Sequence, residues 1–536
     1  MLTAPAAPSG SPASASTTSR PARAARPLLP LACIAAGFAG FGLGAVDCLN
    51  FTVDDSFISL RFAENWASGA GLVFNPGERV EGFSNLLWTV LLGVLARFGI
   101  RQQAGPFELL IAAKLLGCVF ALGALVVLSL HLRAGRSDPD PERAHPLLAL
   151  AVLGAGSTFS FALWSLSGME TGLCAFCVTL AGCLMLRALR RTELTGAPAR
   201  GLFMAAGIAF GVLALVRPEQ IAIWGLAMAI SLLAGPGTLR RPLVDSALPT
   251  LLVFAGLLAW RWSYYGQLVP NSVVAKWGGG ATYALLGAKY ALAAVVCTVG
   301  VMGLAVLALP SLLSAGAEIR FLVAYCASYL AFIAVSGGDW MPGFRFIVPL
   351  VPLLWLLSIS AAVRLVDAAF PKLSPRIVAL AVAVLAFASM MNGRALVRAL
   401  ADFPTGIKQR VWVTTPERVD VARELSRLVP HGTTVAIGEC GFVPYFAPSL
   451  RFLDVFGLMD PRIARLPGAH FSKLTLAQFL RRDPEFYMMM TRRLPDDEVV
   501  PTHPDGLMLL AAPEFRARYA VVRYFPGFTL YRRTGG

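Results

Sequence analysis

The sequence predicts a polytopic α-helical membrane protein that carries a soluble α/β domain at its carboxyl end. Apolar residues make up 56% of the 536 residues, and charged residues make up only 14%, against about 25% in soluble domains. Apolar runs long enough to cross a bilayer recur up to residue 392, and the composition changes after them. These observations exclude a disordered protein, a secreted disulfide scaffold and an ordinary soluble enzyme.

Residues 1–26 are rich in Ala, Ser and Pro and are expected to form a disordered cytoplasmic tail. The segment 27–392 is expected to form the transmembrane domain. Its apolar runs lie near 27–49, 106–131, 146–166, 170–187, 201–217, 220–236, 246–262, 284–310, 320–336, 344–364 and 376–392. Short loops rich in Arg are typical of the cytoplasmic side, so the basic loop after residue 187 sets the orientation. We expect about 11 crossings, with the amino terminus inside and the carboxyl terminus outside.

A further apolar run, 85–100, is ambiguous. If it crossed the membrane, the basic loops on one side of it would face outwards, against the usual charge distribution. We therefore expect it to form a juxtamembrane helix within a first outer loop that spans residues 50–105.

Residues 393–536 are more highly charged and are expected to form a soluble extracytoplasmic α/β domain. Strand-like runs lie at 433–437 and 519–524, and a helix-like stretch lies at 416–428. The five histidines are too scattered to suggest a metal cluster. Cys174 and Cys177 have the spacing of a redox motif but lie within an apolar run, which favours a packing role.

The most informative segment begins a few residues after the first span. Ile58, Phe62 and Trp66 recur at helical spacing and predict an amphipathic helix on the membrane surface, with Asp54 and Asp55 at its amino end. Asp54 also suits a simple helix cap, so the pattern alone leaves both roles open. The turn-rich loop that follows has neither Rossmann nor P-loop glycine spacing, which excludes that mode of nucleotide binding.

The residues from Asp54 to Trp88 read DDSFISLRFAENWASGAGLVFNPGERVEGFSNLLW. They resemble the first outer loop of the bacterial terminal arabinofuranosyltransferases, GT-C superfamily enzymes that use polyprenyl-phosphate sugars. Further matching pieces occur in order, and the resemblance covers nearly the whole chain beyond residue 45. They are WSLSGMET (164–171), LVRPE (215–219), YYGQLVPNSVVAK (264–276), GGDWMPGFRFIVPL (337–350), and GFVPY with DVFGLMD after residue 440.

The resemblance implies a GT-C fold and an inverting transfer of D-arabinofuranose from a polyprenyl-phosphate donor. The acceptor would be a glycan or protein at the outer face of the bacterial cytoplasmic membrane. It also implies that the aspartate pair supplies the base. We assign that role to Asp54, with Asp55 orienting a sugar hydroxyl or a metal, and the two roles could be exchanged. No cofactor is certain, and Mg²⁺ or Mn²⁺ on Asp54 or Asp55 is the candidate.

The departing phosphate requires positive charge. The candidate ligands among the outer cations are Arg61, Arg217, Lys276 and Arg345. Snorkelling, a local salt bridge or interfacial anchoring would equally account for single members of this group. The candidate substrate contacts in the outer segments are Glu81, Glu170, Glu219, Asn271, Asp339 and Trp340.

Two alternatives keep the membrane fold but change the function. One is a GT-C transferase for another polyprenyl-phosphate sugar, such as mannose or an aminoarabinose. The other is a transporter of lipid-linked sugars, which should show repeat symmetry and broken helices near the midplane. The polar segments concentrate at one face of the predicted bundle, which favours a transferase. The thinly spread basic charge, mostly beside apolar runs, does not favour nucleic acid as a partner.

Overall fold

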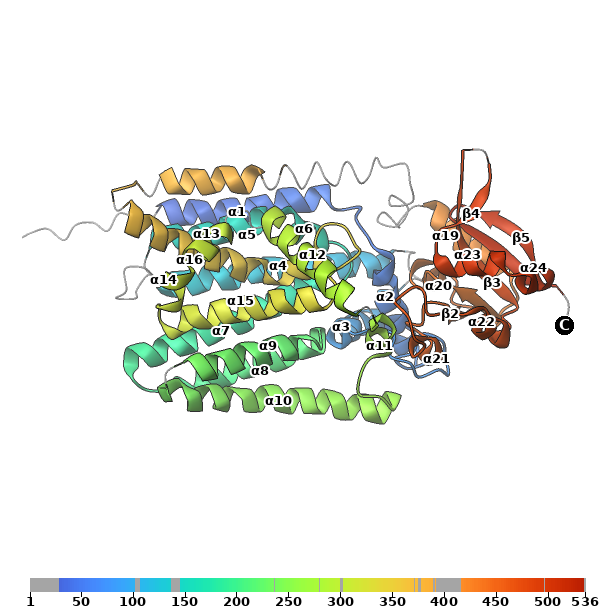
Figure 1. Ribbon diagram of the computed structural model, residues 1–536, viewed down its shortest axis with the longest axis horizontal. Helices are drawn as coiled ribbons and strands as arrows, with labels where there is room; N and C mark the ends of the chain where they lie inside the picture. The colour runs from blue at the N-terminus through green and yellow to red at the C-terminus, as the bar shows by residue number, and fades with distance from the viewer. Residues whose placement is uncertain are drawn as a thin grey trace, which may run out of the picture.

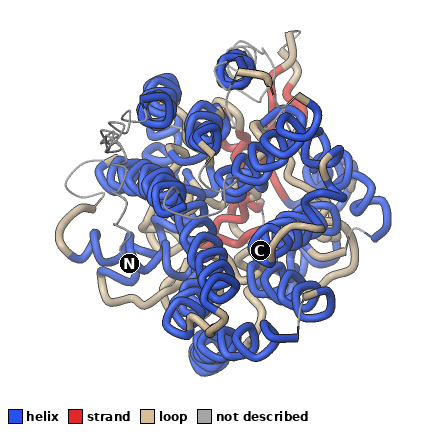
Figure 2. The backbone as a smooth tube through the Cα atoms, turned by 90° about the vertical axis from the view of Figure 1, so that its left-hand side faces the viewer, coloured by secondary structure: helices blue, strands red, loops and turns tan. Residues whose placement is uncertain are grey.

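The computed structural model describes residues 28–101, 107–135, 145–235, 237–278, 280–298, 302–370, 372–374, 377–388, 391, 416–495 and 497–534. Long helices lie side by side in a bundle, and a separate domain with a β-sheet sits at one end of it (Figure 1). Viewed along the bundle, the strands of this C-terminal domain lie behind the helices (Figure 2). The predicted tail 1–26 and the segment 393–415 lie outside the described residues.

Every apolar run predicted to span the membrane contains helix. Within the described ranges, seven helical segments are long and apolar enough to cross a bilayer. They are α1 (Leu28–Asp47), α4 (Glu108–Gly135), α7 (Thr171–Thr195), α10 (Gly237–Tyr265), α12 (Gly280–Thr298), α15 (Ala317–Val335) and the continuous segment of η2 (Arg345–Leu350) with α16 (Val351–Ala369).

The remaining runs form shorter or interrupted helices. An eighth crossing is present if η1 (Pro146–Ala149) and α5 (Leu150–Ser157) form one span with α6 (Phe159–Ser165), which is bent from them by 51°. α8 (Arg200–Val216), α9 (Gln220–Ala234) and the helix Ile377–Ala388 are shorter, and α13 (Met302–Leu307) and α14 (Leu309–Leu313) follow α12. The count of 11 crossings therefore stays a prediction.

The bundle is apolar on the outside as well as in the core. α10 exposes Leu251 and Leu252, and α12 exposes Leu285 and Leu292. In a soluble protein such faces would mark a binding surface, whereas on these long apolar helices they are the surfaces that contact lipid. The chain is therefore a multi-span membrane protein.

Two helices of the first outer loop lie where the bundle meets the C-terminal domain. α2 (Asp54–Ala67) confirms the predicted helix, but Ile58 and Phe62 are buried in protein rather than spread on a membrane surface. α3 (Leu86–Arg97) lies along α2. The Asn85 side chain just before α3 donates to Ser59 at 3.0 Å, and Arg101 after its end donates to the carbonyl of Ala67 at 3.4 Å.

With both ends of α3 tied to α2, the run 85–100 lies at one face of the bundle. It is also short, since 12 residues of helix extend for about 18 Å against a bilayer core of about 30 Å. The geometry therefore supports the prediction that this run does not cross.

The C-terminal domain contains one mixed sheet in the strand order β2-β1-β3-β6-β5, with β4 paired to β3. β1 (Thr434–Ile437) runs parallel to β2 (Arg451–Asp454) and to β3 (Phe486–Arg493), while β6 (Phe528–Arg533) is antiparallel to β3 and to β5 (Tyr519–Phe525). Ile437 thus pairs with Asp454 and with Met488. The helices and remaining strand are α19 (Pro416–Leu428), α20 (Phe442–Phe446), α21 (Pro461–Ala464), α22 (Leu476–Arg482), β4 (Val499–Pro501), α23 (Pro504–Ala511) and α24 (Pro513–Arg518).

The predicted strands at 433–437 and 519–524 and the predicted helix at 416–428 are thereby confirmed. The segments that leave the carboxyl ends of the parallel strands β1 and β2 turn towards the bundle and contact α2 and α11 (Asn271–Lys276). In parallel α/β sheets this edge is the usual location of ligand sites.

Candidate active site

The candidate site begins with Asp54 and Asp55, the first two residues of α2. The side chain of Asp54 reaches the C-terminal domain, where its Oδ2 and Oδ1 accept hydrogen bonds from the backbone N–H groups of Gly441 (2.8 Å) and Phe442 (2.7 Å). The approach is close, because a Cβ atom at Gly441 would lie 1.9 Å from the carbonyl oxygen of Asp54. Position 441 therefore requires glycine for this contact.

The surroundings of Asp54 favour its protonated form. Burial raises the pKa of this carboxyl well above its ordinary value, the charge of Glu439 raises it further, and the N–H of Phe442 opposes them. Glu439 is itself buried and pairs with Arg418 at 3.1 Å. A carboxylate with a raised pKa accepts a proton more readily than an ordinary aspartate, as a general base near neutral pH must.

Asp55 faces a second group of charges. Its Oδ2 lies 3.9 Å from Nη1 of Arg345, whose Nε pairs with Asp339 at 2.7 Å. The same guanidinium packs over the rings of Trp164 (5.5 Å to the centroid) and Phe346 (5.2 Å). Arg345 is buried, so its charge is held at a fixed position. The local salt bridge foreseen as an alternative role for Arg345 is present.

Arg217 extends this row of charges. It directly follows α8, and its Nε lies 2.9 Å from Glu170 while its Nη1 lies 3.6 Å from Glu219. Arg217 also approaches the ring of Phe346 (5.9 Å), so the guanidinium groups of Arg217 and Arg345 contact the same aromatic ring. Because cations on an aromatic ring are fixed partly by its quadrupole, Phe346 helps to set their spacing.

Lys276, the last residue of α11, differs from the arginines. Its side chain is exposed, and its ammonium makes no hydrogen bond or ion pair with the residues that the structure describes. Surrounding protein nevertheless desolvates the ammonium and lowers its pKa, while the negative charge of Asp55 acts in the other direction and raises it. Arg345 and Arg217 lie near enough to lower that pKa further. Lys276 is thus a cation of this cluster that is available to a ligand.

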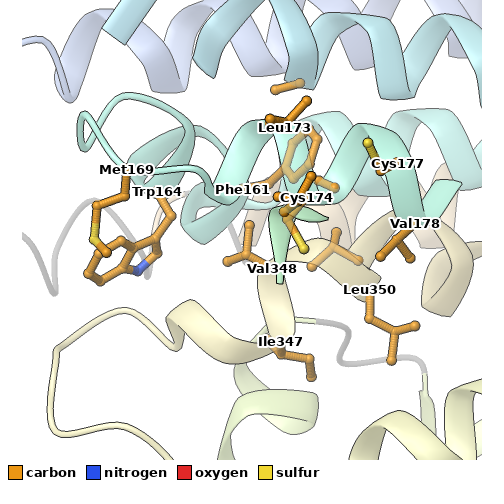
Figure 3. Packing of buried hydrophobic residues seen from close by; sticks show 14 of the residues in the cluster. Phe161, Trp164, Met169, Leu173, Cys174, Cys177, Val178, Ile347, Val348 and Leu350 are labelled. Atoms are coloured by element: carbon orange, nitrogen blue, oxygen red, sulfur yellow. The ribbon is translucent and has the colours of Figure 1, made fainter. Parts of the chain in front are cut away.

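A packed apolar layer supports these charges (Figure 3). Trp164 donates from Nε1 to the carbonyl of Gly343 at 3.0 Å, and Sδ of Met169 lies 3.3 Å from Nη1 of Arg345. The other labelled members come from α6 (Phe161), α7 and η2 and are buried. They include Leu173, Cys174, Cys177, Val178, Ile347, Val348 and Leu350. The packing role predicted for Cys174 and Cys177 agrees with their burial in this layer.

The structure places Arg61 away from the cluster, contrary to its assignment as a phosphate ligand. Its guanidinium donates to the carbonyl oxygens of Phe74 (2.8 Å), Pro444 and Leu450 (3.2 Å). Burial lowers the pKa of Arg61 to about 10. Since its donors are used by backbone carbonyls, Arg61 joins α2 to the C-terminal domain instead of contacting a ligand.

Glu81 and Asn271, assigned as substrate contacts, also make protein contacts. Glu81 pairs with Arg261 at 3.0 Å, and its backbone carbonyl accepts from the N–H of Asn271 at 2.9 Å. Burial raises the pKa of Glu81 to about 7, although Arg261 opposes this shift. The amide of Asn271 donates to the carbonyls of Gly457 and Leu458, both at 2.8 Å. These residues fix the loops that carry the cluster.

Trp340 remains exposed beside Asp339, where it is free to stack on a sugar.

The sequence reasoning did not single out Arg261, although a charged residue inside an apolar run is a recognisable signal of function or pairing. It also missed Asn85, whose amide donates to Glu170 at 2.6 Å. The contact of Gly441 with Asp54 has no sequence signal, because the two residues are far apart in the chain.

The donor set around the aspartate pair does not fit a divalent cation. Both oxygens of Asp54 accept backbone N–H groups, and Asp55 faces Arg345. Across the described ranges, no three or more His, Cys, Asp or Glu side chains are grouped so as to hold a metal ion. Mg²⁺ and Mn²⁺ favour several oxygen ligands at once. The expectation of a metal on Asp54 or Asp55 gains no support from these residues.

Comparisons with known proteins agree with this architecture. Residues 408–535 match a family model described as a domain of unknown function (DUF8728). Two terminal β-(1→2)-arabinofuranosyltransferases are similar in sequence. The one from Mycobacterium tuberculosis (strain ATCC 25618 / H37Rv) is 35% identical over 230 residues, 42% of this chain and 34% of that protein. The one from Corynebacterium glutamicum (strain ATCC 13032) is 28% identical over 337 residues, 57% and 47% of the two chains. The chain thus matches less than half the length of these curated relatives.

Solved structures share the fold. ArnT from Cupriavidus metallidurans bound to undecaprenyl phosphate superimposes with a TM-score of 0.56 at 14% identity, covering 95% of this chain and 98% of that one. The archaeal oligosaccharyltransferase AglB from Archaeoglobus fulgidus, in complex with an inhibitory peptide and a dolichol-phosphate, gives 0.51 at 10% identity, covering 87% and 74%. The predicted GT-C fold and the resemblance to terminal arabinofuranosyltransferases are confirmed.

Proposed function

We propose that this chain is an inverting glycosyltransferase that moves D-arabinofuranose from a polyprenyl-phosphate donor to a glycan or protein acceptor. The reaction takes place at the outer face of the bacterial cytoplasmic membrane. The observation that carries the proposal is the aspartate pair at the start of α2, where the bundle meets the C-terminal domain, with Asp55 facing the cations Arg345 and Lys276 and Arg217 next to them. The similarity to arabinofuranosyltransferases supports the sugar, and the fold shared with ArnT bound to undecaprenyl phosphate supports the donor class.

The chemistry requires a base and a phosphate site. Asp54 accepts the proton of the acceptor hydroxyl while the oxygen forms a bond to the anomeric carbon. The bond from that carbon to the phosphate oxygen breaks, and its electron pair leaves with the polyprenyl phosphate. Because phosphate is a good leaving group, no general acid is needed, and one displacement inverts the anomeric centre.

The arginines and Lys276 have different parts in binding the phosphate. Arg345 and Arg217 pair with the carboxylates of Asp339, Glu170 and Glu219, so these arginines are held rigidly and we assign them a positioning role beside the phosphate. Lys276 is exposed, and no described residue pairs with it, so we assign it the direct contact with the departing phosphate. Positive charge fixed before the reaction stabilises the developing negative charge without reorganisation.

The first test is a transfer assay with purified protein and synthetic polyprenyl-phospho-arabinofuranose, with the mannose analogue in parallel and mass spectrometry of the released lipid phosphate. Turnover of the arabinose donor alone supports the proposal, and turnover of the mannose donor alone contradicts the sugar. If neither donor reacts but the protein moves the lipid across a vesicle bilayer, it is a transporter.

The role of the aspartates is tested in the same assay. Asp54→Asn and Asp55→Asn should each lower kcat, the former by about 10²- to 10⁴-fold, the range attributed to a general base. Asp420→Asn is a matched control, because this aspartate is 70% exposed in the C-terminal domain. Full activity in both Asp54→Asn and Asp55→Asn would show that the pair has no catalytic role.

A further inference from the structure

The helix that carries Lys276 is too short to hold its own position. α11 has six residues, whereas isolated helices shorter than about 12–15 residues are only marginally stable in water. It begins directly after Pro270, and Gly278, two residues beyond its end, has a φ of 134° in the left-handed region. The place of α11 in the molecule is therefore set by the elements that pack against it.

The C-terminal domain supplies contacts at both ends of this helix. α11 packs against α21 where the bundle meets the domain (Figure 1). At the start of α11, the amide of Asn271 donates to the carbonyls of Gly457 and Leu458. Beyond its end, a Cβ atom at Gly278 would lie 2.6 Å from the carbonyl oxygen of Gly468. Both ends of α11 thus lie against the segments that flank α21.

Lys473 joins the two helices directly. It is buried, and its Nζ donates to the carbonyls of Ala464 at 2.8 Å and of Val274 at 3.1 Å. Ala464 ends α21, and Val274 lies two residues before the end of α11. Carbonyls in the last turn of a helix have few partners within that helix, and a cation is favoured beside them. One buried ammonium therefore caps the carboxyl ends of both helices.

The end of α11 that Lys473 supports carries Lys276. Desolvation lowers the pKa of the Lys276 ammonium and the carboxylate of Asp55 opposes this shift, so the ammonium lies within electrostatic reach of the aspartate pair. It also lies close to His470, whose pKa is lowered to about 3, first by burial and then by the charge of Lys276. A displacement of α11 would move this ammonium relative to Asp55.

We propose that Lys473 is a positioning residue, which holds the end of α11 so that the ammonium of Lys276 meets the phosphate of the lipid-linked sugar. Lys473 is buried and directs its donors at two carbonyls, so it acts through Lys276 and not on the lipid itself. This inference rests on the proposed transferase function and gives the C-terminal domain a part in binding the donor phosphate.

The test measures binding of undecaprenyl phosphate to the full chain in lipid nanodiscs, with undecaprenol, which lacks the phosphate, as the comparison ligand. Lys473→Met removes the ammonium but keeps a long side chain. It should weaken binding of undecaprenyl phosphate about tenfold and leave binding of undecaprenol unchanged. In the transfer assay, KM for the donor should rise by a similar factor while KM for the acceptor stays the same.

A double-mutant cycle shows whether the effect passes through Lys276. Lys276→Ala removes a hydrogen bond to a charged group and should weaken binding of undecaprenyl phosphate at least as much as Lys473→Met does. The double variant should bind no more weakly than Lys276→Ala, because a positioning residue has no effect once the residue that it positions is gone. Arg465→Met is the matched control, since this exposed arginine donates to the carbonyl of Pro461 within the same segment.

Multiplied losses in the double variant would overturn the proposal, and so would an equal loss of undecaprenol binding in Lys473→Met. If Lys473→Met does not fold, Lys473→Gln, which keeps a donor, takes its place in the cycle. If wild-type protein neither binds undecaprenyl phosphate nor turns over the donor, the transferase function fails, and hydrogen exchange then tests the positioning alone. The amides of α11 should exchange about tenfold faster in Lys473→Met than in Arg465→Met, and equal rates would refute the role of Lys473.

Discussion

Replacing Gly441 by alanine is the most direct test of the contact between the C-terminal domain and the proposed base. The new Cβ would lie 1.9 Å from the carbonyl oxygen of Asp54 and 2.5 Å from its Oδ2. To restore a normal contact, the turn and the start of α2 must separate by about 1 Å, which stretches the hydrogen bonds from Gly441 and Phe442 to the carboxylate. Each such bond to a charged group contributes about 1.5–3 kcal/mol.

A displacement of about 1 Å at a reacting group can cost about 100-fold in rate. We therefore expect Gly441→Ala to lower kcat about 100-fold in the transfer assay, with a smaller change in KM for the donor, because the cation cluster is not displaced. Gly506→Ala, in α23, is the matched control. Its Cβ would meet the Cβ of Pro501 at 2.8 Å, inside the C-terminal domain.

Thermal unfolding monitored by intrinsic fluorescence would show whether either variant disturbs the fold. A Gly441→Ala protein with turnover within twofold of wild type would refute the idea that this turn positions the base. Equal loss of activity in Gly506→Ala and Gly441→Ala would assign the effect to general damage of the domain.

Three further predictions concern protonation, stability and topology. The base must be ionised to act, and the pKa of Asp54 is raised. The pH at which kcat begins to fall on acidification should therefore lie well above the ordinary aspartate pKa of about 3.9. A pH–rate profile that stays flat down to pH 4 would contradict this prediction. Glu81→Gln leaves Arg261 buried without its partner and should destabilise the protein by about 3–5 kcal/mol, which the double variant Glu81→Gln/Arg261→Met should largely restore in thermal unfolding. A cysteine at Arg101 should react with a membrane-impermeant maleimide added from outside, since Arg101 contacts the end of α2, whereas labelling only after permeabilisation would show that α3 crosses the membrane.

Helices and strands that depend on residues close together in the sequence were predicted correctly. The apolar runs form helices because hydrogen bonding within the segment is the way an apolar chain satisfies its backbone in lipid. The alternating residues around Val435 and Val521 form strands β1 and β5, and this pattern lies within the strands themselves. The juxtamembrane position of 85–100 was inferred from charge counting and is supported by the ties of Asn85 and Arg101 to α2.

Contacts between segments that are far apart in the sequence could not be predicted from local patterns. A cation in an outer loop can bind a phosphate or donate to backbone carbonyls equally well. Only the structure shows that Arg61 donates to the carbonyls of Phe74, Pro444 and Leu450. The partner of Glu81 is 180 residues away, at Arg261. Nothing in the sequence near either residue specifies the other, because the pair forms only when the first outer loop packs against the end of α10.

The hydrogen bond between Gly441 and Asp54 also has a consequence for the biosynthesis of the protein. The two residues are separated by 387 positions, which at about 5–20 residues per second correspond to about 20–80 s of translation. During that interval the early helices are already inserted, but the carboxylate lacks the amides that orient it. If the chain has the transferase function proposed above, a nascent or prematurely terminated chain is inactive, and activity begins only after the C-terminal domain has folded against α2.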